Sequence, residues 1–158
     1  MSARAAWRLQ TFGFDQVYRF KPGRQAWFAY GLPLEGQMAS SPRAGDVLRR
    51  DVPLCHLHER VGDVWERVRG AGWDQCIVVD GDKVVLGRLG RTALRGAPTA
   101  TVEEVMTAGP VTVRPNRLLA ELVARMRARR VGSMVVTDPD GRLIGVLFRR
   151  DAEQRLAR

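Results

Sequence analysis

The chain has 158 residues, of which 45% are hydrophobic and 27% charged, which is the size and composition of a soluble globular protein with one domain or two small lobes. No apolar run approaches the roughly 18 residues that span a bilayer, and no long apolar core follows the start, so we expect a cytoplasmic protein without a membrane span or a secretory signal. The net charge of +9 comes almost wholly from arginine, and because no basic run is interleaved with stacking aromatic residues, we attribute it to solvated helix faces and do not expect nucleic-acid binding.

The first 36 residues are predicted to form a small α-β-α extension. A helix is expected over residues 3–10, a short strand over 16–20 and a second helix over 23–30, which ends at the helix-stop sequence Gly-Leu-Pro at 31–33. So short a segment cannot build an independent core, and we expect it to dock on the rest of the chain or on another subunit. Six aromatic residues would make it sticky if they stayed exposed, namely Trp7, Phe12, Phe14, Trp27, Phe28 and Tyr30.

This extension, residues 1–36, resembles the C-terminal end of a rhodanese domain. The resemblance is carried by Ala5-Ala6, Leu9, Gly13-Phe14, Val17-Tyr18, Gly23, Trp27, Gly31-Leu32-Pro33 and Glu35-Gly36. It implies a catalytic cysteine in a loop before this segment, whereas neither Cys55 nor Cys76 stands in a Cys-x-x-Gly-x-Arg context. Sulfur transfer would lack its nucleophile, so we expect no enzymatic activity. A start site assigned too far downstream would explain the same headless fragment.

After a small, polar linker at 37–43, two stretches are predicted to fold in the same order: a short helical turn, a strand, an amphipathic helix, two strands joined by a tight turn, and a closing helix. In the first stretch, residues 44–97, the elements before the closing helix are expected at 45–48, 53–56, 61–68, 75–79 and 84–89. In the second stretch, residues 101–158, the elements are expected at 102–106, 111–114, 118–126, 133–137, 142–147 and 149–156.

The second stretch repeats the first without a gap at an offset of 58 residues. Gly87 falls on Gly145 (145 − 87 = 58), and Asp80 falls on Asp138 at the start of the tight turn. A repeat this long indicates one supersecondary unit used twice, with each copy burying its open face against the other. We therefore predict an α+β fold in which two β-α-β-β-α repeats pack as a pseudo-two-fold pair, preceded by the small extension.

The two cysteines, Cys55 and Cys76, lie in predicted strands and are expected to be small buried hydrophobic residues. The sequence Cys-His-Leu-His at 55–58 looks like a metal site, but alternation along a strand would send Cys55 to one face and His56 and His58 to the other. A fourth ligand at suitable spacing is also missing, so we expect no metal site.

Copy two, the second stretch, carries three motifs: VMTAGPVTVRP at 105–115, SMVVTD at 133–138 and DGRLIGVLFRRD at 140–151. On these motifs, residues 43–158 resemble a tandem pair of cystathionine-β-synthase (CBS) domains, known as a Bateman module, and the resemblance is looser in copy one. It implies a regulatory protein for signal transduction, which binds AMP, ATP or S-adenosylmethionine in clefts between the copies and pairs into a disc-like homodimer.

The ligand motif of this family is a glycine, two apolar residues, a threonine or serine, two variable residues and an aspartate, whose carboxylate takes the ribose hydroxyls. In copy two the motif reads GVLFRRD at 145–151, so Asp151 is present and Phe148 replaces the hydroxyl. Arg149 and Arg150 stand at a helix start, where they would suit a phosphate. In copy one, GRLGRTA at 87–93 has neither the hydroxyl nor the aspartate.

We therefore expect at most one nucleotide site, built around Asp151 with the base against the strand starts. Its predicted members are Asp151, Arg150, Arg149, Val111, Thr112, Ser133 and Met134. The alternative for Asp151 is a plain surface carboxylate in a terminal helix, paired with Arg150 or Arg155.

Four functions stay open, in decreasing order of preference. The first is a nonenzymatic sensor that binds an adenine nucleotide between the copies and signals in trans to an unknown protein partner or through its own dimer. The second is an interaction or dimerisation module whose degenerate sites bind no nucleotide. The third is nucleic-acid binding by the arginine surface, with an affinity that falls steeply with salt. The fourth is a sulfurtransferase, whose activity would require Cys55 or Cys76.

Overall fold

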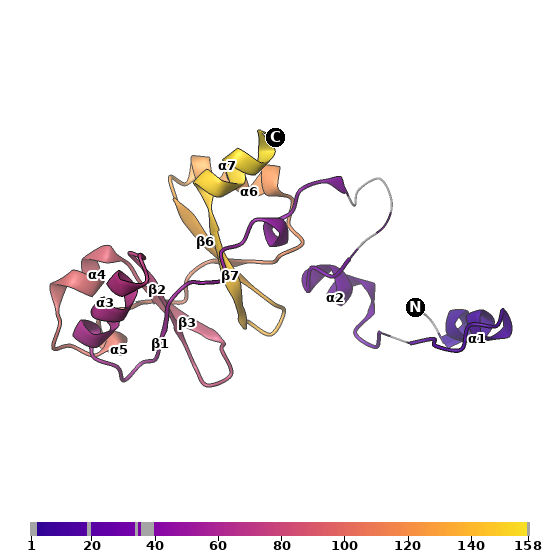
Figure 1. Ribbon diagram of the computed structural model, residues 1–158, viewed down its shortest axis with the longest axis horizontal. Helices are drawn as coiled ribbons and strands as arrows, with labels where there is room; N and C mark the ends of the chain where they lie inside the picture. The colour runs from indigo at the N-terminus through magenta and orange to yellow at the C-terminus, as the bar shows by residue number, and fades with distance from the viewer. Residues whose placement is uncertain (1–2, 19, 34, 36–39, 158) are drawn as a thin grey trace.

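The 58-residue repeat folds into two lobes with the same order of elements (Figure 1). The computed structural model describes residues 3–18, 20–33, 35 and 40–157. Lobe one contains β1 (Leu54–Cys55), α3 (Val61–Gly70), β2 (Cys76–Val79), β3 (Val85–Leu89) and α4 (Arg91–Gly96). Lobe two contains β5 (Thr112–Val113), α6 (Leu119–Ala128), β6 (Ser133–Thr137), β7 (Leu143–Phe148) and α7 (Arg149–Leu156). The predicted α+β fold with two β-α-β-β-α repeats is confirmed.

Each lobe packs two helices on a sheet whose central strand is parallel to one neighbour and antiparallel to the other. β2 lies between β1 and β3, and β6 lies between β5 and β7 in the same manner. Residues three and four apart share one face of a helix, so an apolar stripe on the long helix of each lobe is buried. The buried residues are Val61, Val64 and Val68 on α3, and Leu119, Leu122, Val123 and Met126 on α6.

The segments that lead into the two copies change places. Lead-in one, residues 44–49, starts with the 3-10 helix η2 (Ala44–Asp46) and packs on lobe two, where the Ala44 N–H donates to the Arg117 carbonyl at 2.9 Å. Lead-in two, residues 102–108, carries α5 (Val102–Val105) and β4 (Thr107–Ala108) and packs on lobe one, where β4 pairs with β3. Each lobe is therefore completed by a segment that belongs to the other copy.

Two glycines at equivalent positions of the repeat make room for this exchange. A Cβ on Gly145 would lie 2.6 Å from the carbonyl oxygen of Arg49, whose backbone exchanges hydrogen bonds of 3.0 and 2.9 Å with Val146. A Cβ on Gly87 would lie 2.5 Å from Met106 Sδ and 3.1 Å from the carbonyl oxygen of Thr107. Glycine in a strand often marks such a close approach by another backbone.

Equivalent residues of the two copies meet across a pseudo-two-fold axis. Ser133 Oγ donates to Gln75 Oε1 at 3.4 Å, and Val84 forms an isolated β-bridge with Arg142; the members of each pair are 58 residues apart. Val135 and Val146 of lobe two also belong to the core cluster of lobe one. The two open faces thus bury each other, as the repeat predicted.

The N-terminal arm, residues 3–35, carries α1 (Ala3–Thr11) and α2 (Gly23–Ala29). The prediction of a strand over 16–20 is wrong at 16–18 and 20, because no strand of the described residues offers this segment a hydrogen-bonding edge. Residue 19 lies outside the described residues, as do residues 37–39 of the predicted linker. None of the described helices has both the length and the apolarity needed to cross a bilayer.

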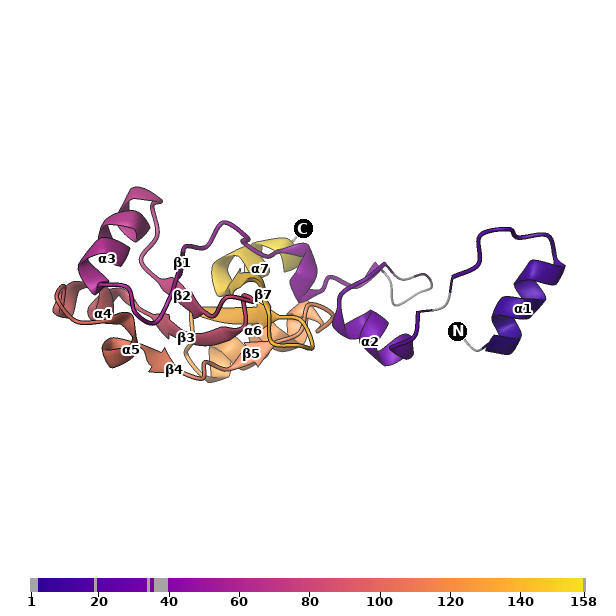
Figure 2. The same cartoon turned by 90° about the horizontal axis from the view of Figure 1, so that it is seen from below.

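The predicted docking of the arm is confirmed for α2 and not for α1, which stands apart from both lobes in two perpendicular views (Figures 1 and 2). Tyr30 Oη donates to Asp140 Oδ2 of the β6–β7 turn at 3.3 Å, and Gly31 lies against Pro115 of lobe two. On α1, Trp7 is 64% exposed, and Phe12 and Phe14, which follow the helix, are exposed as well.

Gly145→Ala should destabilise the pair of lobes by about 1–3 kcal/mol, because the new methyl group would meet a backbone oxygen that is itself fixed by two hydrogen bonds. Gly70→Ala is the matched control, since a Cβ there would meet nothing within 4 Å and the residue ends a helix. Urea denaturation of both variants and of the parent chain measures the difference. Equal free energies of unfolding for the two variants would contradict the role given to Gly145.

Gly31→Ala should release α2 from lobe two, whereas Gly23→Ala should not. Both glycines have positive φ (70° and 83°), so alanine costs each about 1–2 kcal/mol of backbone strain. Only at Gly31 would the Cβ also lie 2.9 Å from Pro115 Cβ. Since a helix of 7 residues is not stable alone, release should melt α2 and speed its amide hydrogen exchange. Equal acceleration in both variants would show that contact with Pro115 does not hold the arm.

Candidate functional site

Most of the predicted nucleotide-site residues lie at one end of the lobe-two sheet. Ser133 pairs with Phe148 across β6 and β7, and the Arg149 N–H donates to the Gly132 carbonyl at 2.9 Å. Thr112 pairs with Val135 on the other side of β6, which brings the start of β5 to the same end. This end therefore gathers three strand termini and the first turn of α7, which begins at Arg149.

The remaining predicted members divide into exposed and buried residues. Arg150 and Asp151 lie in the first turn of α7, and Val111 is exposed just before β5. Met134 instead belongs to the core cluster of lobe two, because alternation along β6 places Ser133 and Met134 on opposite faces. The structure thus brings Ser133 to the boundary between the lobes and takes the Met134 side chain away from it.

An aromatic platform lies beside Asp151, built by Trp73 of lobe one and Phe148 of lobe two. The two ring centroids are 5.6 Å apart and the ring planes are tilted by 47°. The guanidinium of Arg49 covers the platform, with its Cζ 4.6 Å from the Trp73 ring centroid and 6.0 Å from that of Phe148. Phe148 thus serves as one half of a stacking surface at the position where the family motif has a hydroxyl.

Arg49 is held on this platform by Asp51. Two hydrogen bonds of 2.8 and 3.3 Å join the guanidinium to both carboxylate oxygens. The Arg49 hydrogen bond is the main reason why the pKa of Asp51 lies below its ordinary value, and the same bond raises the pKa of Arg49. The Asp151 charge also favours the charged form of Arg49, which places Asp151 within electrostatic reach of the platform.

Asp151 makes no ion pair with Arg150 or Arg155 in the part of the chain that the structure describes. The surface-pair alternative for Asp151 is therefore not the arrangement found. Arg149 approaches Glu153 at 4.0 Å, and that carboxylate is already bound by Arg127 at 2.8 Å.

Gln75 leaves a buried hydrogen-bonding group without a partner between the lobes. The residue is 8% exposed, its Oε1 accepts from Ser133, and its Nε2 has no hydrogen-bond partner among the described residues. A buried donor without a partner costs about 1–3 kcal/mol, and this nitrogen is closed off from solvent. Its neighbour Ser133 ties this amide to the same end of the lobe-two sheet.

Arg49, Asp51, Trp73 and Gln75 were missed by the sequence reasoning, which looked within one copy at a time. The signal that could have found the platform is a difference between the copies. At the offset of 58 residues, the two rings of the platform and the arginine that covers them correspond to residues without a stacking side chain. Trp73 corresponds to Val131, Phe148 to Gly90, and Arg49 to Thr107.

An open cavity lies on lobe one, at the place that the pseudo-two-fold axis relates to the platform. The cavity measures about 400 Å³, and its lining includes Arg88, Gly90, Arg91, Ala93 and Thr107. Gly90 and Ala93 stand at the positions of Phe148 and Asp151, so neither a stacking ring nor a carboxylate is available. The two halves of the molecule are alike in backbone and different in chemistry.

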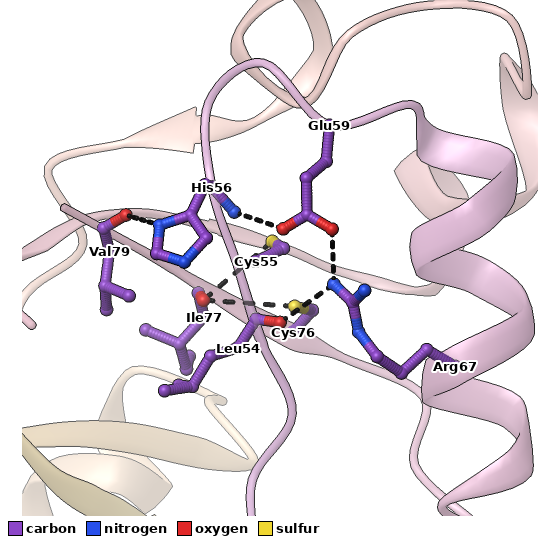
Figure 3. A network of polar contacts seen from close by, with 8 residues as sticks. All are labelled: Leu54, Cys55, His56, Glu59, Arg67, Cys76, Ile77 and Val79. Carbon is purple, nitrogen blue, oxygen red and sulfur yellow. Dashed lines mark hydrogen bonds and ion pairs between the residues drawn. The ribbon is translucent and has the colours of Figure 1, made fainter. Parts of the chain in front are cut away.

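The cysteines are buried members of a polar network at the β1–β2 edge (Figure 3). Cys55 and Cys76 are both fully buried, and both thiols donate to the Ile77 carbonyl, at 3.8 and 3.9 Å. A hydrogen bond with Cys55, followed by burial, raises the pKa of Cys76 far above its ordinary value. Neither thiol can meet a substrate in the folded chain, and the described residues hold no cluster of three metal-ligating side chains.

The network is completed by the loop that follows β1. Glu59 accepts from the His56 N–H at 2.7 Å and from Arg67 at 2.7 Å, and His56 Nδ1 lies 3.0 Å from the Val79 carbonyl (Figure 3). The Arg67 guanidinium also donates to the Leu54 carbonyl at 3.1 Å, and the Glu59 hydrogen bond raises its pKa. These contacts tie α3 to the strands, which is a structural role.

Comparison with known proteins also distinguishes the two copies, because the family model matches copy two. Residues 102–158 match the sequence model of the CBS domain. No curated protein matches the chain.

Solved structures match over both lobes. The cytosolic domain of the Mg²⁺ channel MgtE in complex with ATP is 24% identical with a TM-score of 0.67, over 75% of this chain and 51% of that one. This chain therefore spans about half the length of that relative. The CBS domains of a transcriptional regulator from Streptococcus pneumoniae are 22% identical with a TM-score of 0.65, over 72% of this chain and 98% of theirs. CBSX2 in complex with AMP is 20% identical with a TM-score of 0.65, over 73% of this chain and 96% of that one.

The fold of this chain is therefore that of a tandem pair of CBS domains, and its second copy matches the CBS domain in sequence as well.

Proposed function

We propose that this protein is a nonenzymatic sensor that binds one adenine nucleotide between its lobes, beside Asp151. The observation that carries the proposal is the convergence of ligand-binding chemistry from both lobes at one place. Lobe one supplies Trp73, and lobe two supplies Phe148 and Asp151. Aromatic rings and a carboxylate are groups that bind a base and a ribose.

Each group has a role in the proposed complex. The base stacks on the platform of Trp73 and Phe148, and Asp151 accepts hydrogen bonds from the two ribose hydroxyls. Arg149 and Arg150 suit the phosphate, since guanidinium groups bind phosphate with paired hydrogen bonds. The polar residues Thr112 and Ser133 and the exposed Val111 border the base. The structural relatives that carry AMP, ATP or S-adenosyl-L-methionine in their described complexes support an adenosine ligand.

A signal could arise because the proposed site lies between the two lobes. A ligand that contacts both lobes favours the lobe arrangement in which those contacts are best, and it shifts the population toward it. We propose that an unknown protein partner or the second subunit of a homodimer reads this arrangement in trans, in the cytoplasm. The rhodanese-like arm, residues 3–35, is proposed as a contact element for such a partner, because Trp7 and Tyr18 are largely exposed.

AMP, ATP or S-adenosylmethionine should raise the thermal midpoint of the purified chain, and Asp151→Asn should remove most of that shift. A hundredfold excess of ligand over its Kd stabilises the native state by about 2.7 kcal/mol, so a shift of several degrees is expected. Asp63→Asn is the matched control, because it makes the same change in the first turn of α3. A screen that is flat for every adenosine compound would overturn the proposal.

A flat screen would favour the second candidate, an interaction or dimerisation module without a ligand. The observation behind it is that Phe148 and the covering guanidinium of Arg49 fill the region of the motif hydroxyl, while Ala93 removes the carboxylate from lobe one. This module would form a dimer whose stability does not depend on nucleotides.

Both cysteine thiols are expected to be unreactive in the folded protein. A thiol reacts as the thiolate, and Cys76 combines full burial with a raised pKa. Folded protein at pH 8 should therefore react with a disulfide reagent such as DTNB only at the rate at which the chain opens, and both thiols should react at once in denaturant. Rapid labelling of the folded chain would reopen the sulfurtransferase hypothesis.

A further inference from the structure

The Arg49 side chain occupies the surface that the proposed nucleotide site offers to a base. Its guanidinium is planar and delocalised, it stacks on aromatic faces as a base does, and it lies 4.6 Å from the Trp73 ring centroid. Asp51 is bound to its outer edge, at 2.8 Å. We propose that Arg49 is a built-in gate, a stand-in for the base that any ligand must displace, and that this gate selects phosphorylated ligands over free nucleosides. The proposal rests on the nucleotide site proposed above.

The backbone of Arg49 is fixed by hydrogen bonds to Val146, while its side chain is held by Asp51 and by the rings of Trp73 and Phe148. The two hydrogen bonds to Val146 and the close contact with Gly145 hold the Cα at the end of the lobe-two sheet. The side chain itself is 48% exposed, and its tether Asp51 is exposed as well. The exposed ion pair with Asp51 is weak, and the cation–π contact lies on the buried ring of Trp73, so the ligand that displaces the guanidinium must stack on that ring at least as well.

Selection follows from what the displaced guanidinium can do next. A nucleotide offers it a phosphate, with which arginine forms paired, charge-assisted hydrogen bonds. A nucleoside offers no such partner, so it must break the contacts of Arg49 with Trp73, Phe148 and Asp51 without replacing them. The gate therefore weakens the binding of adenosine and leaves the binding of AMP less affected. The corresponding positions of the repeat hold Thr107, Val131 and Gly90, so the equivalent place on the other side of the pseudo-two-fold axis has no such gate.

The test compares adenosine and AMP binding by isothermal titration to the full chain and to Arg49→Ala. The variant should bind adenosine about tenfold more tightly, and AMP with little change or more weakly, because the stand-in and the phosphate partner are lost together. Arg117→Ala is the matched control, since Arg117 is an exposed arginine in an ion pair with Glu121 at 3.1 Å. It should leave the affinity for both ligands unchanged.

Two further measurements separate stacking from charge and from unfolding. Arg49→Lys keeps the charge but loses the planar stack, so it should also bind adenosine more tightly; binding equal to that of the parent chain would overturn the gate. The tryptophan emission of Arg49→Ala without ligand should shift to the red, because Trp73 loses its cover, and its thermal midpoint shows whether the variant is folded.

The outcomes distinguish the gate from the site. If the parent chain binds AMP and Arg49→Ala binds adenosine no more tightly than the parent does, the gate is wrong and the site stands. If neither ligand binds to the parent chain or to any variant, the nucleotide site itself is wrong, and the gate falls with it.

Discussion

The whole arrangement depends on how closely the backbone of one copy passes over the sheet of the other. Gly87 and Gly145 leave out the side chain that would block this passage, and lead-in one and lead-in two then complete the opposite lobes. A lobe is therefore not a continuous stretch of chain, and neither copy can build its full sheet edge alone. The exchange links the two lobes through the chain and through packing, because each lead-in belongs to one copy and packs on the lobe of the other.

The exchange also explains how one site can draw on distant parts of the sequence. Arg49 comes from the segment that leads into copy one, Trp73 from the loop between α3 and β2 in lobe one, and Phe148 from the end of β7 in lobe two. The pseudo-two-fold axis provides two equivalent places for such a meeting, and the chemistry is present at one of them. At the other, Gly90 and Ala93 line an open cavity. The backbone keeps the symmetry that folding needs, and the side chains break it.

The sequence was a good guide where structure is decided locally, and a poor one where distant segments meet. The apolar stripe of α6 and the helix that starts at Arg149 follow from neighbours three or four residues apart, and both are present. The strand expected over 16–20 failed because a strand needs a partner edge, which propensity does not supply. The platform was harder to find, because it joins residues of both copies and shows in the sequence as a difference between the copies at the 58-residue offset.

The N-terminal arm and the proposed gate share one short piece of chain. Pro115 of lobe two lies between Gly31 of the arm and Gly45 of lead-in one, and its carbonyl accepts from the Gly45 N–H at 2.9 Å. Arg49 follows Gly45 by four residues, in the same lead-in and on the same lobe. The backbone of this lead-in is held to lobe two at both ends, by the Gly45–Pro115 and the Arg49–Val146 hydrogen bonds, so it stays in place while the Arg49 side chain is displaced. Because α2 is too short to be helical without the surface at Pro115, the helix depends on this fixed part of the molecule.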